Sequence, residues 1–119
     1  MDDALNSLDV WKRSRHLAVA IFKIFASCKN YGFKDQITRA SVSIPSNIAE
    51  GFERNSKKEF IYFLRIARGS CAELRTQLYI SEDINLIDTQ IAQQLQQEAL
   101  EISKMLQGLI NRYKIKDNS

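Results

Sequence analysis

The side chains of this sequence that could do acid–base or metal chemistry are few and scattered. His16 is the only histidine, and helical periodicity places it beside Lys12 and Lys23, away from the apolar positions. Carboxylates are the other candidates, and four of them follow one another along the chain: Glu50, Glu53, Glu59 and Glu73. A di-metal helical bundle needs Glu-x-x-His motifs, which are missing, and no glycine-rich phosphate loop is present. The sequence therefore predicts no enzyme, no metal site and no cofactor.

Cations are the more promising chemical groups. Residues 10–80 hold thirteen Lys or Arg against five Asp or Glu, whereas residues 81–119 hold four against six. A positive surface of this kind attracts phosphates. We expect nucleic-acid contacts from Lys12, Arg13, Arg15, Lys23, Arg54, Lys57, Lys58, Arg65 and Arg75. The alternative is that these charges form a solvated face, partly paired with glutamates.

The segment Arg-Asn-Ser-Lys-Lys over residues 54–58 is a basic turn at the predicted start of a helix. Free N–H groups and the helix dipole already favour an anion there. The positive end of the helix repels Lys57 and Lys58, and a bound anion would offset this electrostatic cost. Contact with phosphates would be weakly sequence-selective and sensitive to salt.

Four amphipathic helices position these residues, over about 8–30, 34–54, 56–80 and 88–114. Ser56 and Glu59 match a capping box at the start of the third helix, and Asp88 is a suitable N-cap for the fourth. Short links between the helices imply an all-α fold, an antiparallel up-down-up-down four-helix bundle, in a single domain of residues 1–119.

The only proline, Pro45, lies in the middle of the second helix. It removes a hydrogen bond and crowds an earlier carbonyl, at a cost of about 3 kcal/mol in an ordinary helix, so we expect a kink. Polar side chains of the second and third helices are predicted to form a structural network, in which Glu50 meets Arg68 and Arg39 meets Glu73. Its members are Arg39, Ser43, Asn47, Glu50, Arg68 and Glu73. The alternative is that Arg39 and Arg68 face an anionic ligand.

The third helix is apolar on two sides. One row is predicted to face the core and consists of Phe60, Leu64, Ala67, Cys71, Leu74 and Leu78. The other row, on roughly the opposite side, holds Tyr62, Ile66 and Ile80. A lone four-helix bundle covers only one side of such a helix. The pattern therefore predicts a homo-oligomer with Tyr62, Ile66 and Ile80 in its interface.

Two segments carry a family resemblance: Gln-Ile-Thr-Arg-Ala-Ser-Val-Ser-Ile-Pro-Ser-Asn-Ile-Ala-Glu-Gly over residues 36–51, and Ile-Ala-Arg-Gly-Ser-Cys-Ala-Glu-Leu over residues 66–74. Together they resemble the four-helix-bundle proteins encoded by intervening sequences within bacterial 23S rRNA genes. The resemblance covers about residues 8–113, with Cys71 standing where an apolar residue such as Leu is expected. It implies a small helical subunit, commonly assembled as a ring-shaped homopentamer with basic surface patches. The family's biochemical role is poorly defined.

The sequence thus predicts a non-catalytic, oligomeric helical bundle that binds RNA or DNA through a basic surface. The resemblance allows an association with ribosomal RNA, or a role like that of the accessory subunit of diversity-generating retroelements, which works beside a reverse transcriptase. A hypothesis from another class is a protein-interaction scaffold whose partner docks on the outer apolar row.

The expected compartment is the cytoplasm. The acidic start, residues 1–6, lacks an apolar signal-peptide region, and no apolar run reaches the length of a membrane span. Cys28 and Cys71 both fall on apolar helix faces, where reduced cysteines of cytosolic proteins are common. We therefore expect no membrane partner.

Overall fold

The computed structural model describes the backbone of residues 3–118 and the side chains of residues 4–114. Within that range the chain forms a one-turn helix, α1 (Asp3–Asn6), and four long helices: α2 (Asp9–Ile24), α3 (Tyr31–Phe52), α4 (Lys57–Asp83) and α5 (Thr89–Asn118). None of the described residues is in a strand. The predicted all-helical bundle is confirmed.

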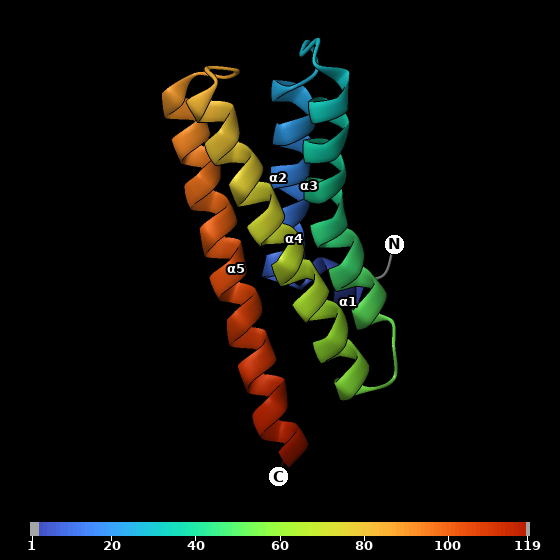
Figure 1. Ribbon diagram of the computed structural model, residues 1–119. Helices are drawn as coiled ribbons and strands as arrows, with labels where there is room; N and C mark the ends of the chain where they lie inside the picture. The colour runs from blue at the N-terminus through green and yellow to red at the C-terminus, as the bar shows by residue number, and fades with distance from the viewer. Residues whose placement is uncertain (1–2, 119) are drawn as a thin grey trace.

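The four long helices pack beside one another. Figure 1 shows the chain turning back on itself between successive long helices. Each long helix contacts the next one along the chain, and α2 also contacts α5. Because α4 packs against both α3 and α5, one of its sides remains outside the bundle. That side carries several of the predicted site residues.

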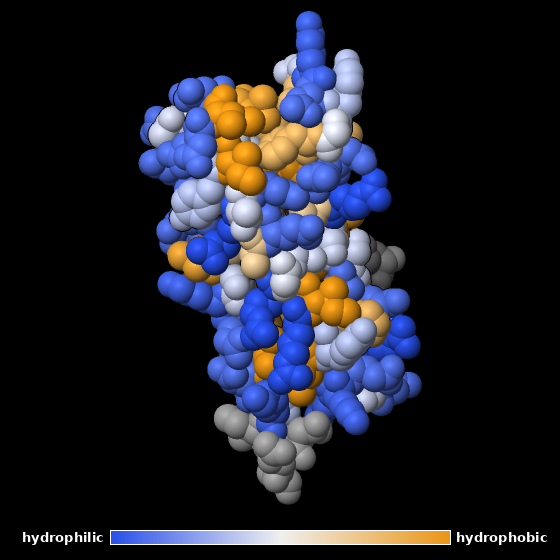
Figure 2. All heavy atoms as spheres, in the orientation of Figure 1, coloured by the Kyte–Doolittle hydropathy of each residue, from blue (hydrophilic) through white to orange (hydrophobic). Residues whose placement is uncertain are grey.

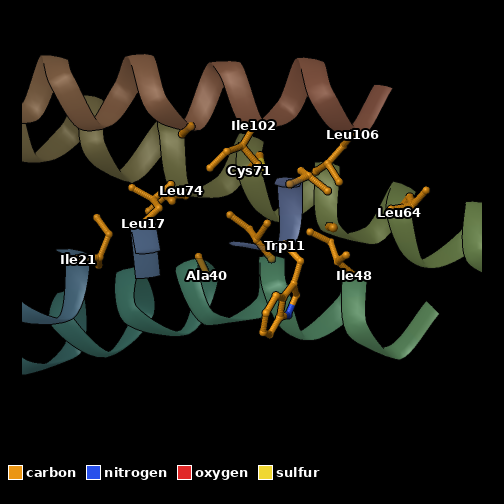
Figure 3. Packing of buried hydrophobic residues seen from close by; sticks show 14 of the residues in the cluster. Trp11, Leu17, Ile21, Ala40, Ile48, Leu64, Cys71, Leu74, Ile102 and Leu106 are labelled. Atoms are coloured by element: carbon orange, nitrogen blue, oxygen red, sulfur yellow. The ribbon is translucent and has the colours of Figure 1, made fainter. Parts of the chain in front are cut away.

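The core is built from the rows that helical periodicity predicts. Every member of the predicted core row of the third helix is 5% exposed or less: Phe60, Leu64, Ala67, Cys71, Leu74 and Leu78. Figure 3 shows side chains of all four long helices in the space between them, among them Ile21 of α2, Ala40 of α3, Cys71 of α4 and Ile102 of α5. Burial of these groups stabilises the bundle by roughly 25 cal/mol per Å² of apolar surface.

The first long helix is shorter than the predicted range 8–30, which is wrong at its C-terminal end. α2 ends at Ile24, and residues 25–30 connect it to α3. The side chain of Asn30 accepts a hydrogen bond from the Phe33 N–H at 3.2 Å and so caps α3. Lys34 Nζ donates to the carbonyl oxygen of Ala26 at 2.8 Å. An N-cap has a non-helical backbone, so Asn30 separates the two helices.

The capping residues predicted for the last two helices are confirmed. Ser56 Oγ accepts a hydrogen bond from the Glu59 N–H at 3.2 Å, and Asp88 Oδ2 accepts one from the Gln90 N–H at 3.1 Å. These contacts satisfy backbone donors that a helix start would leave without partners.

The third predicted helix ends later than expected, at Asp83 instead of residue 80. Asn85 has a φ of 57°, the left-handed conformation that closes many helices. The Leu86 N–H donates to the carbonyl oxygen of Ser81 at 2.9 Å, and the Asn85 N–H donates to that of Glu82 at 3.1 Å. These two bonds form a Schellman motif. Asparagine, with its tolerance of this backbone, takes the position that glycine usually holds.

Pro45 is buried inside α3, which is helical from Tyr31 to Phe52. Polar side chains bond to backbone carbonyls near the proline: Ser41 Oγ donates to Thr38 at 2.8 Å, and Asn47 Nδ2 donates to Ser43 at 2.8 Å. Such local bonds are the expected response to a disturbed helix. The bend at Pro45 stays a prediction.

Small residues let α3 and α4 approach each other closely near their shared turn. Gly51 of α3 is buried, and a Cβ atom there would lie 2.7 Å from Phe63 Cβ and 3.0 Å from Phe60 Cδ1. Real Cβ atoms do not come this close to another carbon, so this contact requires glycine. It fixes how α4 begins relative to the end of α3.

Candidate nucleic-acid interface

A polar cluster joins α3 and α4 at the middle of their contact. The hydroxyl groups of Ser43 and Ser70 form a hydrogen bond of 2.8 Å, and Asn47 Nδ2 donates to Ser43 Oγ at 3.0 Å. Ser43 and Asn47 were predicted members of a network, whereas Ser70 was missed. Its place in a small-residue motif, Gly-Ser-Cys-Ala at residues 69–72, was the available signal. The cluster sets the register of the two helices.

The other four predicted network members lie elsewhere. Arg39 pairs with Asp35 at 2.6 Å, Glu50 lies 3.5 Å from Arg54, Glu73 is exposed, and Arg68 donates to Gln107 of α5. Among the described side chains, the predicted pairs Glu50–Arg68 and Arg39–Glu73 are not formed, so these two predictions are wrong. Arg39 and Glu73 do line the same hollow, of about 340 Å³.

The register accounts for the missing Glu50–Arg68 pair, and a competing partner accounts for the missing Arg39–Glu73 pair. Ser43 is opposite Ser70, and α3 and α4 run in opposite directions (Figure 1). Glu50, seven residues after Ser43, is therefore roughly 10 Å along the axis from Ser43, whereas Arg68, two residues before Ser70, is only about 3 Å along it in the same direction. Arg39 has an acidic partner one turn away on its own helix, and such i,i+4 pairs form readily. Helical periodicity alone predicts neither the register of α3 against α4 nor which acidic partner Arg39 takes.

Arg13, a predicted nucleic-acid contact, is paired with two carboxylates of α5. Its Nε donates to Glu98 Oε2 at 3.0 Å, and its Nη2 donates to Glu98 Oε1 at 2.5 Å and to Glu101 Oε1 at 2.8 Å. Nη1 lies 3.5 Å from Met105 Sδ. The hydrogen bonds to Glu98 and Glu101 raise the pKa of Arg13 above its ordinary value. The guanidinium thus ties α2 to α5, with three N–H groups directed at carboxylates and one at the Met105 sulfur.

Several other predicted cations are partly engaged. Lys12 lies 3.6 Å from Asp9. The guanidinium of Arg15 lies 4.9 Å from the centre of the Trp11 ring. Arg54 lies within 3.5 Å of two carboxylates, those of Glu50 and Glu59, and 5.1 Å from the Phe63 ring. Arg75 is half-buried, with an Nε atom that has no hydrogen-bond partner among the described residues.

The remaining predicted cations are exposed and have no carboxylate within 4 Å among the described side chains: Lys23, Lys57, Lys58 and Arg65. Lys23 is in the last turn of α2, where a cation interacts favourably with the helix dipole. The other three follow one another along the first turns of α4. Three of these four cations therefore lie at one end of the bundle, whereas Lys23 lies at the other (Figure 1).

A hollow of about 360 Å³ lies between these α4 residues and the end of α5. We call it the α4–α5 basic groove, and its lining residues are Lys58, Ile61, Tyr62, Arg65 and Lys114. Among the side chains that the structure describes, it has three cations and no carboxylate. Lys114 was missed as a site residue because residues 81–119 are acidic on balance. The signal for it was local: Arg112, Lys114 and Lys116 are clustered at the end of the last helix.

Two neighbouring hollows lie at the same end of the molecule. One, of about 350 Å³, surrounds the turn between α3 and α4 and includes Arg54 and Lys57. The other, of about 420 Å³, lies between the start of α2 and α5, where Asp9 offsets Arg112. Of these three hollows, as lined by the described residues, the α4–α5 basic groove is the one that combines several cations, an exposed aromatic ring and no acidic group.

The three predicted interface residues are exposed on the outer side of α4. Tyr62 is 60% exposed, Ile80 42% and Ile66 37%. Tyr62 lines the α4–α5 basic groove, whereas Ile66 and Ile80 lie outside it. Figure 2 shows two hydrophobic areas on the face that α4 crosses, separated by hydrophilic side chains. Strongly hydrophilic side chains border the lower of these areas.

Groups suited to catalysis are sparse in the described part of the chain. His16 is exposed, and no three His, Cys, Asp or Glu side chains among the described residues gather as a metal site would require. Burial raises the pKa of the Cys71 thiol to about 12, with Arg75 acting weakly in the opposite sense. No helix among the described residues has the length and apolar character to cross a bilayer.

Comparison with known proteins adds two findings. The family model described as 23S rRNA-intervening sequence protein matches residues 6–108. A crystal structure of a protein with unknown function from the S23 ribosomal protein family of Bacteroides thetaiotaomicron is similar, with 27% sequence identity and a TM-score of 0.80. The similarity covers 85% of this chain and 97% of that one. No curated protein matches the sequence.

Proposed function

This chain belongs to the 23S rRNA-intervening sequence protein family, and from that premise we propose that it is a non-catalytic, oligomeric helical bundle that binds RNA or DNA. Contact is made through the α4–α5 basic groove and the adjacent turn between α3 and α4. The family's name makes ribosomal RNA the first nucleic acid to test. A partnership with a reverse transcriptase and a protein-scaffold role are less favoured, since no contact or comparison points to either.

The grouping of unpaired cations is the observation that carries the proposal. Lys58, Arg65 and Lys114 converge on one hollow without a carboxylate in its lining. Like charges gathered on a surface repel one another, and that cost is offset when a polyanion binds. The chain has a formal net charge of +3. Several of its other arginines are paired with carboxylates, whereas these three cations remain free to bind phosphates. Such contacts fix position on the backbone of a nucleic acid and carry little sequence information.

Assembly is the second part of the proposal. The scaffold is an up-down-up-down bundle with α3 bent at Pro45, and the outer side of α4 is the subunit contact through Ile66 and Ile80. A ring of five copies, as the family resemblance implies, repeats the groove around the assembly. Repetition raises the overall affinity for a long strand without any new contact, because later binding events become intramolecular.

The test is a comparison of two variants with the same net charge. Lys58→Glu/Arg65→Glu removes two cations from the groove, and Lys29→Glu/Lys104→Glu removes two exposed cations from other places. Binding of labelled ribosomal RNA fragments and of DNA of equal length is measured across a salt series. The groove variant is expected to lose binding and to flatten the slope of log K against log[salt] by about 2, while the control keeps its slope.

Either of two results would contradict the proposal. Absence of binding by the unmodified protein at low ionic strength would remove its mechanism. Equal loss in both variants would mean that net charge, and not the groove, attracts the nucleic acid. Circular dichroism and light scattering on both variants verify that helicity and assembly are unchanged.

A further inference from the structure

Tyr62 presents an aromatic ring to solvent inside a cluster of cations. The side chain is 60% exposed. Its ring meets that of Phe63 edge to face, with centroids 5.2 Å apart and an interplanar angle of 82°. That contact occupies one part of the Tyr62 ring and leaves the rest of its surface open to solvent. Phe63 is in turn covered by the guanidinium of Arg54 at 5.1 Å.

The cations flank this ring along the helix. Lys58 precedes Tyr62 by four residues and Arg65 follows it by three, so all three side chains share one face of α4. A rise of 1.5 Å per residue puts Lys58 about 6 Å before Tyr62 and Arg65 about 4.5 Å after it. Lys114 closes the groove from α5, and Ile61, which is 6% exposed, lies beneath. The groove therefore has an aromatic centre and charged ends.

An aromatic ring between cations matches an unpaired nucleotide better than a duplex. In a duplex the faces of the bases are covered by their neighbours, so a protein meets phosphates and groove edges. In a single strand each base has a free π face that stacks on an aromatic side chain, while cations hold the backbone. A duplex would use the cations of the groove and leave the Tyr62 ring without a partner.

A second copy of the chain fits this spot less well. In a two-fold contact three cations would face the same three, and in a ring the next copy would have to bring carboxylates to them, since none is among the lining residues. Ile66 and Ile80 lie outside the groove and do not meet this difficulty.

We infer, resting on the proposed function, that the α4–α5 basic groove selects single-stranded nucleic acid. One base stacks on Tyr62, and the phosphates on either side of it are held by Lys58, Arg65 and Lys114. The groove would thereby distinguish loops, bulges and ends of a folded RNA from its helices.

Three probes of equal length separate stacking from charge: a labelled 12-nucleotide uridine oligomer, the same oligomer with abasic sites, and a 12-base-pair duplex. They are bound to the unmodified protein and to three variants. Tyr62→Leu keeps apolar bulk but loses the aromatic face, Tyr62→Phe keeps that face, and Tyr79→Leu is a matched control. Tyr79 is 50% exposed on the same helix and lies outside the groove. Light scattering reports the assembly state of each protein.

The uridine oligomer is expected to bind most tightly, and the abasic oligomer roughly 5- to 150-fold more weakly. Tyr62→Leu should lower affinity for the uridine oligomer by a similar factor without changing its salt slope, since no phosphate contact is lost. Tyr62→Phe and Tyr79→Leu should behave like the unmodified protein. Affinity of the abasic oligomer should be the same for all four proteins.

Equal binding of the uridine and abasic oligomers, or no effect of Tyr62→Leu, would overturn the stacking inference while leaving charge-based binding in place. A lower mass in solution for Tyr62→Leu would overturn it too, by assigning Tyr62 to the subunit contact. Failure of all three probes to bind the unmodified protein at low salt would instead refute the proposed function.

Discussion

Arg13 of α2 and Glu98 of α5 are joined by two parallel hydrogen bonds across 85 residues of sequence, at 3.0 and 2.5 Å. Glu101, one turn further along α5, accepts a third bond from the same guanidinium at 2.8 Å. Paired bonds of this kind combine charge with a fixed geometry. They hold the first long helix of the chain against the last.

Replacement of Arg13 by Met should destabilise the protein by about 1 kcal/mol, a value reduced for solvent screening because the Arg13 side chain is 36% exposed. Urea unfolding measures the loss, and a double-mutant cycle with Glu98→Gln isolates the pair. Arg39→Met is the control, because the Arg39–Asp35 pair is 78% and 69% exposed and should contribute less than about 0.5 kcal/mol. Equal losses at the two sites would refute the structural role of Arg13.

The stability of the protein should fall in acid partly through Glu101. Hydrogen bonds from Arg13, and then from Gln97, hold the pKa of Glu101 below its ordinary value of 4.5. At a pH between the folded pKa and the ordinary pKa of Glu101, the unfolded chain binds more protons than the folded one. The stabilisation by Glu101 is therefore fully present above its ordinary pKa and is lost as the pH falls through the folded pKa. Urea midpoints from pH 6 to pH 3 should therefore drop less steeply in Glu101→Gln. Superimposable curves would contradict this assignment.

Gly51→Ala should be destabilising, although alanine is the better helix former by about 1 kcal/mol. The added methyl would meet Phe63 Cβ at 2.7 Å, and overpacking of this kind costs about 1–3 kcal/mol. The matched control is Gly108→Ala, since nothing lies within 4 Å of a Cβ there, and that variant should gain stability. Thermal unfolding of both variants gives the comparison, and a gain at both positions would disprove the close approach at Gly51.

The two cysteines should differ in reactivity. Cys71 is fully buried, and burial raises the pKa of its thiol to about 12, so little thiolate forms and reagents cannot reach it. Cys28 is half-buried. Iodoacetamide at pH 8 should therefore modify one thiol, and the second only after unfolding, as intact-protein mass spectrometry would reveal. In Cys28→Ser the early modification should disappear. Two early modifications in the unmodified protein would contradict the burial of Cys71.

Ile66→Glu should break the proposed assembly while the subunit stays folded. The residue is 37% exposed in the subunit, so a charge there costs little until a second copy covers it. Light scattering should report a smaller mass, with unchanged circular dichroism. Val19→Glu, at an exposed position of α2, is the control. An unchanged mass for Ile66→Glu would rule out the outer side of α4 as the subunit contact.

The sequence predicted helix boundaries well where the signal was a capping residue. The pattern of Ser56 and Glu59 predicted the start of α4, and Asp88 that of α5, because a cap depends only on neighbouring residues. The end of α2 was missed because the apolar pattern continues through the buried Phe25 to Cys28, although the helix has ended at Ile24. Periodicity describes which face is buried and not where the backbone changes direction.

Long-range polar contacts were predicted less well. Helical periodicity placed Arg13 among the basic residues but could not show that Glu98 lies beside it. Likewise, the register set by Ser43 and Ser70 decides which charges face each other, and no single-helix pattern contains that information. The α4–α5 basic groove depends in the same way on Lys114 reaching α4 from a helix that begins 25 residues earlier in the chain, at Thr89.

α2 has 16 residues, against 22, 27 and 30 for the other long helices, and its packing is mainly with α3. Amide protons of α2 should therefore exchange with deuterium sooner than those of α4 and α5, since local opening follows the least supported segment. A molecule with its first helices transiently detached would retain the α4–α5 hairpin and, with it, the surface on which nucleic-acid contact is proposed. Transient opening of the first helices and binding of nucleic acid to that surface are thus independent events.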